Sequence, residues 1–200
     1  MSASPQWRSS RRALLIWLAA SAATRSFGHA TRTNERLPVI GPAPRFSLVR
    51  ETGVRFESEE LRGKIAAVTF IYATCKDTCP VLAGKLVKLQ RRLGTDFGSN
   101  VRFVAISVDP EVDTPEVLRG YAEALGADRA GWTFLTGKPE EVRGVVRDFG
   151  AFARKNPRGD VDHLYLTSLV DRNGAMRVQY LGYRFDPDEM LRDLKALLRE

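Results

Sequence analysis

Hydrophobic residues follow two spacings along most of this 200-residue chain. Segments 65–72 (IAAVTFIY) and 101–108 (VRFVAISV) are almost continuously apolar, which is typical of strands buried on both faces. In 81–93 the leucines recur every three or four residues, which is typical of a helix with one buried face. These two patterns predict strands at 45–49, 54–58, 65–72, 101–108, 132–135, 164–170 and 176–181, and helices at 81–93, 115–125, 139–149 and 186–198.

Turn and capping residues mark the ends of these elements. Thr114 followed by Pro115 predicts a helix start, because a hydroxyl can cap the first backbone N–H groups and proline suits the first helical position. Asn173-Gly174 predicts a tight hairpin turn between two strands, and 51–53 a looser one. Strands therefore alternate with helices, after a hairpin at the N-terminal end and before a second hairpin and a last helix. This order predicts an α/β, thioredoxin-like fold: a central mixed sheet flanked by helices, with an N-terminal hairpin and an insertion.

The first thirty residues have a different composition from the rest. Arg8, Arg11 and Arg12 precede an apolar stretch at 13–23, and small residues follow it, as in a signal peptide or an N-terminal membrane anchor. Residues 31–44 are polar and proline-rich and predict a linker, which leaves 45–200 as the domain. We expect the domain to be exported, in the bacterial periplasm or anchored facing it; a mitochondrial location is the less favoured alternative. Thiols can be oxidised in such a compartment.

Charge argues against nucleic acid as a partner. The formal net charge is +7, but residues 1–30 contribute four arginines and no acidic residue. The remaining +3 is not gathered into a basic tract or a basic motif with aromatic residues. The positive balance therefore belongs mainly to the targeting segment.

The sequence CKDTCP at 75–80 contains the only two cysteines, Cys75 and Cys79. They are one helical turn apart and follow the buried strand 65–72, so we expect both at the start of the next helix. The positive end of a helix stabilises thiolate, which is both the nucleophile and the metal ligand, and Lys76 would act in the same direction. An inert structural disulfide is the less favoured interpretation, because so short a loop constrains the unfolded chain little.

His163 is the only histidine of the expected domain, and it lies next to a strand that this fold brings near the cysteines. Two thiolates and an imidazole suit Cu(I) and can also hold Cu(II). Structural zinc needs a fourth ligand, for which Asp77 or Asp162 is available, so zinc is disfavoured without being excluded. Most lone histidines near a strand end are structural, and this remains the alternative for His163.

Several motifs together resemble the Sco/SenC family of copper chaperones for cytochrome c oxidase assembly. They are TFIYATCKDTCP (69–80), SVDPEVDTPEVL (107–118) and VDH before LYLTSLVDRNG (161–174). The resemblance implies that Cys75, Cys79 and His163 are the copper ligands. It also implies delivery of copper to the dinuclear site of oxidase subunit two, or reduction of that subunit's cysteines. Other periplasmic copper chaperones or thiol reductases are the further partners that it implies.

The family match leaves some residues without a definite role. Asp77, Asp109 and Pro110 match family positions, but we assign none of them as a ligand, and a strand end leading to the Thr114 cap explains the last two almost as well. Lys76 stands where the family commonly has proline. This departure keeps the ligand set and leaves the balance between copper carrier and thiol reductant open.

An exported thiol–disulfide oxidoreductase of the thioredoxin fold is the main alternative, with Cys75 and Cys79 as its redox-active pair. Such enzymes usually have two residues between the cysteines instead of three, and they need no histidine. A peroxiredoxin normally has threonine three residues before its reactive cysteine, where this chain has Tyr72 or Lys76. We further expect His163 to be carried by a long, polar, mobile loop at 151–163, which would let it release copper first.

Overall fold

The computed structural model describes residues 36–75, 78–157 and 160–200, which belong to one compact unit. The expected targeting segment, the first part of the linker, Lys76, Asp77 and Gly159 lie outside the described residues. The strands are β1 (Gly41–Pro42), β2 (Ser47–Arg50), β3 (Arg55–Glu57), β4 (Ile65–Ile71), β5 (Val101–Ser107), β6 (Trp132–Thr136), β7 (Ala153–Lys155), β8 (Val161–His163), β9 (Leu166–Val170) and β10 (Ala175–Leu181). The helices are α1 (Thr78–Leu93), α2 (Pro115–Leu125), α3 (Pro139–Asp148) and α4 (Pro187–Arg199), with short 3₁₀ turns η1 (Ser58–Leu61) and η2 (Gly94–Asp96).

Eight strands form one mixed sheet in the order β1-β10-β9-β4-β5-β6-β2-β3. Strands β4, β5 and β6 are parallel, and β9 and β2 run antiparallel on either side of them. The carboxyl end of β4 therefore lies beside the start of β9, where Thr69 pairs with Thr167. Strands β7 and β8 form a separate antiparallel ribbon. The predicted thioredoxin-like α/β fold is confirmed.

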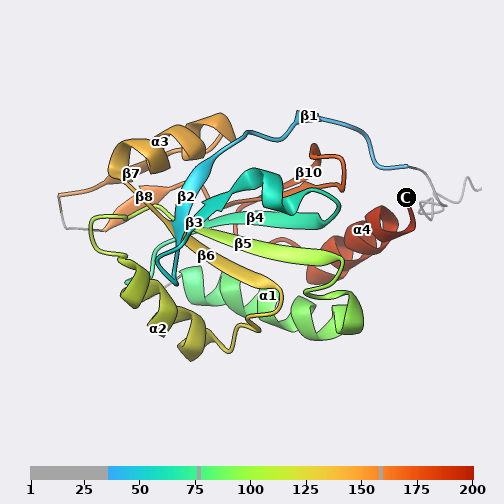
Figure 1. Ribbon diagram of the computed structural model, residues 1–200, viewed down its shortest axis with the longest axis horizontal. Coiled ribbons are helices and arrows are strands. Elements are labelled where there is room, and N and C mark those ends of the chain that lie inside the picture. The colour runs from blue at the N-terminus through green and yellow to red at the C-terminus, as the bar shows by residue number, and fades with distance from the viewer. Residues whose placement is uncertain (1–35, 76–77, 158–159) are drawn as a thin grey trace, which may run out of the picture. The chain divides into compact units, whose positions relative to one another are not determined.

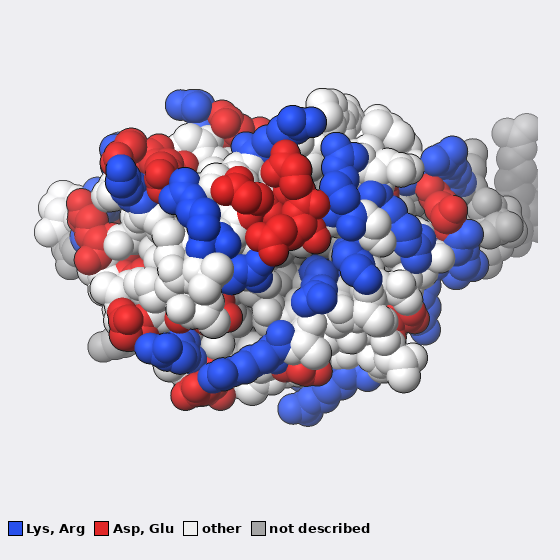
Figure 2. Space-filling model, in the orientation of Figure 1, with Lys and Arg blue, Asp and Glu red and all other residues white. Residues whose placement is uncertain are grey.

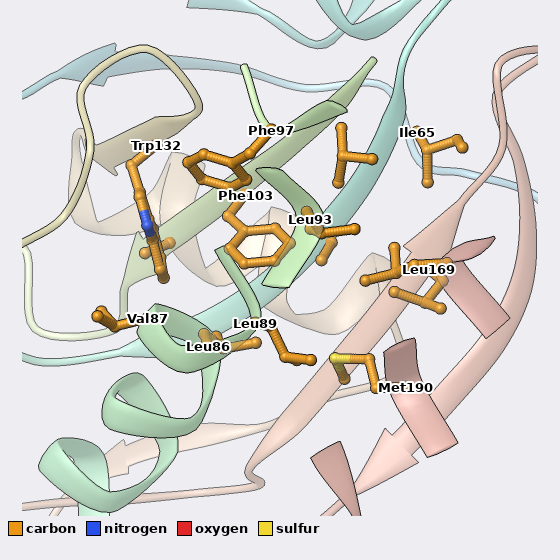
Figure 3. Packing of buried hydrophobic residues seen from close by; sticks show 14 of the residues in the cluster. Ile65, Leu86, Val87, Leu89, Leu93, Phe97, Phe103, Trp132, Leu169 and Met190 are labelled. Atoms are coloured by element: carbon orange, nitrogen blue, oxygen red, sulfur yellow. The ribbon is translucent and has the colours of Figure 1, made fainter. Parts of the chain in front are cut away.

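Helices cover both faces of the sheet. Helices α1, α2 and α4 lie together on one side, and α3 lies on the other with the β7–β8 ribbon near it (Figure 1). Each side has its own apolar core. Figure 3 shows the first, in which leucines of α1 meet Phe103 of β5, Leu169 of β9 and Met190 of α4. The second core includes Phe70, Phe149 and both cysteines, of which Cys75 is 8% exposed at the edge of this core and Cys79 is 0% exposed.

The structure adds detail to the elements expected from the sequence at three places. Part of the predicted linker belongs to the fold: β1 pairs with β10, and Leu37 is buried. Helix α1 begins at Thr78, three residues before the leucine pattern becomes visible, so Cys79 lies in its first turn as expected. Residues 151–163, expected to be a long, polar, mobile loop, contain the β7–β8 ribbon, in which Ala153 pairs with His163. Both pairings join backbone groups whose partners the local sequence does not reveal.

A bulge in β10 places a charged residue inside the protein. The register with β9 shifts between Met176 and Val178, and Arg177 at this point is 1% exposed. Its Nη1 donates to Asp171 Oδ2 at 3.0 Å and to Glu200 Oε2 at 2.8 Å, and its Nε donates to the Leu37 carbonyl at 3.1 Å. Arg177 thus joins the N-terminal segment, the β9–β10 turn and the end of α4.

The surface carries both signs of charge. Figure 2 shows acidic side chains gathered near the middle of one face, with Lys and Arg around them. Exposed ion pairs such as Arg129–Glu123 are worth about 1 kcal/mol or less each, so they contribute little beside the cores. No helix in residues 36–75, 78–157 and 160–200 has both the length and the apolar content needed to cross a membrane.

Candidate metal centre

The loop between β4 and α1 holds Cys75 by backbone contacts. The Cys75 N–H donates to the Tyr72 carbonyl at 3.3 Å. The preceding Ala73 N–H donates to Asp113 Oδ2 at 3.0 Å, and the Ser107 hydroxyl donates to the same oxygen at 2.5 Å. Asp113 is fully buried, and this burial raises the pKa of its carboxyl. The DPEVDTP segment therefore helps to shape the cysteine loop.

The two thiols occupy different environments at the start of α1. Both are present as thiols without a disulfide between them. The backbone N–H of Cys79 donates to Cys75 Sγ at 3.4 Å, the helix-end contact that stabilises negative charge on sulfur. Cys79 itself is 0% exposed, and burial raises the pKa of its thiol. The expectation that the helix would favour thiolate at both positions is therefore wrong for Cys79.

His163 ends β8 and is 8% exposed. Its ring lies 4.3 Å from that of Tyr165 and 5.7 Å from that of Tyr72, measured between centroids. Neither ring nitrogen has a hydrogen-bond partner of normal geometry among the described residues. Burial lowers the pKa of His163 to about 4, so the imidazole is neutral at physiological pH. A buried neutral imidazole without a hydrogen bond of normal geometry has a lone pair available for a metal ion.

Cys75 and His163 line one pocket of about 580 Å³ at the carboxyl end of β4. Tyr72 and Tyr165 also line it, whereas Cys79 is buried in the core. Within the described residues, no three Cys, His, Asp or Glu side chains are close enough together to hold a metal ion. The structure thus brings two of the three predicted ligands to a common opening and puts the third in the interior.

Asp162, the alternative fourth ligand for zinc, is on the outer side of the ribbon. It is exposed, and its Oδ1 accepts a hydrogen bond from Asn156 Nδ2 at 3.2 Å. Asp162 also lines the pocket, so its position does not by itself decide between a zinc site and a copper site.

Sequence reasoning missed Tyr72 and Tyr165, which line the pocket, and Asp113 and Lys155, which lie outside its lining. The tyrosines hold the His163 ring, Asp113 holds the cysteine loop, and Lys155 forms an ion pair with Asp109 at 3.1 Å. The tyrosines could have been suspected, because one ends the buried strand before Cys75 and the other is two residues beyond His163. Nothing local in the sequence indicates that Lys155 reaches Asp109.

The chain is similar to proteins whose names refer to copper and to oxidase assembly. It is 31% identical over 160 residues to the SCO2-like protein of Rickettsia felis, covering 76% of this chain and 74% of that protein. The copper-bound crystal structure of Arabidopsis thaliana ScoI has 29% identity and a TM-score of 0.70, covering 79% of this chain and 99% of that one. BsSco, for which a disulfide switch was identified, is a member of the Sco family of cytochrome c oxidase assembly proteins. It has 26% identity and a TM-score of 0.72, covering 82% and 98%.

A family model also covers nearly the whole of the described fold, including the positions of Cys75, Cys79 and His163. The model of the SCO1/SenC family matches residues 38–199. This chain therefore belongs to the SCO1/SenC family.

Proposed function

We propose that this protein is a copper chaperone that binds one copper ion through Cys75, Cys79 and His163. The observation that carries the proposal is the His163 ring, which is buried and lines the same pocket as Cys75, with no hydrogen-bond partner of normal geometry for either nitrogen among the described residues. A buried polar group without a good hydrogen bond lowers the stability of the fold. Binding of a metal ion by the imidazole lone pair would explain why this group is present. Two soft thiolates together with an imidazole suit copper, and a copper-bound relative supports the same cargo.

We further propose that the copper goes to the dinuclear site of cytochrome c oxidase subunit two, outside the cytoplasm. Family membership supports this target, as does the role in oxidase assembly stated for the Sco family of BsSco. The basic and apolar N-terminal segment supports export, with the N-terminus either cleaved or kept as a membrane anchor.

The depth of the three ligands gives an order of transfer. Cys75 and His163 line the opening, and Cys79 is buried in the core. A ligand of the acceptor that enters through the pocket would reach copper from the side of Cys75 and His163. It would displace one of these first, and the Cys79 thiolate would be the last to leave. Because the three side chains are not yet at ligand distance, copper binding would have to draw them together.

Thiol–disulfide exchange is the second candidate function. Its support is the disulfide switch identified in BsSco, together with the hydrogen bond from the Cys79 N–H to Cys75 Sγ. In this function Cys75 would be the attacking thiol, because it reaches the pocket, and Cys79 would close the disulfide. His163 would have no necessary part.

An anaerobic competition titration of the reduced full-length chain with Cu(I) tests the proposal. We expect one tightly bound equivalent, with much weaker binding in His163→Ala and Cys75→Ser. The rate of exchange with a small disulfide should stay within about twofold in His163→Ala and be lost in Cys75→Ser. If the parent binds Cu(I) no better than an unstructured dithiol and His163→Ala changes nothing, the copper function is wrong and the exchange function replaces it.

A further inference from the structure

The ribbon that carries His163 has an inner and an outer face. Residues that pair across two antiparallel strands share a face, and the faces alternate along each strand. Ala153 pairs with His163, Arg154 with Asp162, and Lys155 with Val161. His163 and Val161 are buried and Asp162 is exposed, so Lys155 lies on the inner face with the imidazole. It is two residues from the position opposite His163, a step of about 7 Å.

Lys155 joins this ribbon to the loop after β5. Its Nζ lies 3.1 Å from Asp109 Oδ1 and 3.3 Å from Glu111 Oε2. The Asp109 side chain is only 5% exposed, whereas those of Lys155 and Glu111 are 41% and 63% exposed. A carboxylate as buried as this one needs a cationic or hydrogen-bonding partner, so the Asp109 contact is the stronger of the two.

The ribbon has few other polar attachments. Asn156 donates hydrogen bonds to the Asp160 carbonyl and to Asp162 Oδ1, at the far end of the ribbon from His163. Lys155 forms the only ion pairs between the ribbon and another part of the protein among the described residues. Apolar contacts also hold the inner face: Val161 is buried, Ala153 packs against the second core, and the His163 ring contacts Tyr72 and Tyr165.

We propose that Lys155 is a positioning residue, which holds the ribbon through Asp109 so that His163 faces the thiol pocket. Lys155 cannot itself ligate copper, because its amine is protonated at neutral pH. The expected effect of Lys155 on copper affinity rests on the proposed copper function. The proposal also gives a role to Asp109, which the sequence left without one. Lys155 therefore acts on copper affinity only through His163.

A double-mutant cycle on the full-length chain tests this route. Lys155→Met keeps the aliphatic stem and removes the charge, and Arg154→Met is its matched control on the outer face, where no ion pair with a described residue is lost. We expect Lys155→Met to weaken Cu(I) binding about threefold to tenfold, and Lys155→Arg and Arg154→Met by less than about twofold. In a His163→Ala background, Lys155→Met should cause no further loss.

Two results of this titration would overturn the proposal. One is an equal loss of affinity in the parent and in the His163→Ala background, which would mean that Lys155 acts by general stability or charge. The other is a loss in Arg154→Met as large as in Lys155→Met.

Hydrogen exchange in the absence of copper tests whether Lys155 holds the ribbon, independently of whether the protein binds copper. We expect the amides of residues 153–155 and 161–163 to exchange at least threefold faster in Lys155→Met than in the parent, and at the parent rate in Arg154→Met. Unchanged exchange in Lys155→Met overturns the proposed positioning role of Lys155, even if the parent binds copper. A parent that binds no copper removes the proposed function, while faster exchange would still establish that Lys155 holds the ribbon.

Discussion

Two buried nitrogen-containing side chains, Arg177 and His163, differ in whether their nitrogens form hydrogen bonds. Arg177 is 1% exposed, and its three nitrogens donate to Asp171, Glu200 and the carbonyls of Leu37 and Pro38. His163 is 8% exposed, and neither of its nitrogens has a partner of normal geometry among the described residues. The first arrangement uses its polar atoms to hold the chain together. The second leaves them available, which is the expected difference between a structural group and a binding group.

The two regions also differ in how their groups are assembled. Arg177 is fixed by parts of the chain that are distant in sequence, from Leu37 to Glu200. His163 is held mainly by aromatic faces, which orient a ring without satisfying its nitrogens. Substitutions around Arg177 should therefore lower stability and leave metal binding unchanged. Substitutions around His163 should weaken metal binding and leave stability at neutral pH largely unchanged.

The largest effect is expected from Arg177→Met. Removing the guanidinium takes away the cationic partner of the largely buried Asp171 and a donor to the Leu37 carbonyl, while Glu200 keeps Arg36, so the free energy of unfolding should fall by about 3 kcal/mol. Urea denaturation measures this loss, with Arg129→Met at an exposed ion pair as the control, for which we expect less than about 1 kcal/mol. Cu(I) affinity of the folded fraction should be unchanged. A stable Arg177→Met variant with weakened copper binding would reverse the comparison.

The next effect concerns pH. The pKa of His163 is lowered to about 4 in the fold, against about 6.5 in an unfolded chain. Between these values the unfolded chain binds a proton that the folded chain does not, so stability falls as the pH falls from 6.5 to 4 and is fully present above 6.5. The loss should approach about 3 kcal/mol at the acid end.

His163→Leu isolates this contribution, because it removes the titrating group and leaves all others. Denaturation of the copper-free parent and variant across pH 4–7 should give curves that diverge toward acid, with the variant the less sensitive. Parallel curves would mean that the imidazole is more exposed than the structure places it.

The smallest of the three effects is on copper affinity. Loss of the imidazole in His163→Leu should weaken Cu(I) binding by about 10–100-fold, and the stability of the copper-free protein at pH 7 should stay the same or rise. Competition titration and urea denaturation of the same samples check both halves. A stability loss above about 2 kcal/mol with unchanged affinity would make His163 a structural residue.

Sequence patterns predicted the elements well where local periodicity decides them. The buried runs became β4 and β5, and the Thr114-Pro115 signal became the start of α2, where the Thr114 hydroxyl accepts the Val117 N–H. They failed where pairing is long-range. Strand β1 is only Gly41–Pro42 and depends on β10, so its polar, proline-rich surroundings resemble a linker.

The candidate site was predictable in its chemistry and less so in its geometry. Cys75, Cys79 and His163 are distinctive because the chain has two cysteines and two histidines, and their roles as ligands remain a prediction. Their unequal depth could not be foreseen, since the burial of Cys79 depends on how the second core packs around the start of α1. The Lys155–Asp109 pair joins residues 46 positions apart, and no local pattern indicates such a contact.

X-ray absorption spectroscopy of the full-length chain loaded anaerobically with one equivalent of Cu(I) tests the central claim most directly. We predict a first shell of two sulfur atoms and one nitrogen atom, with the nitrogen signal and its imidazole outer-shell features absent in His163→Leu. A parent spectrum with sulfur ligands alone, unchanged in that variant, would contradict the assignment of the unpaired imidazole to copper.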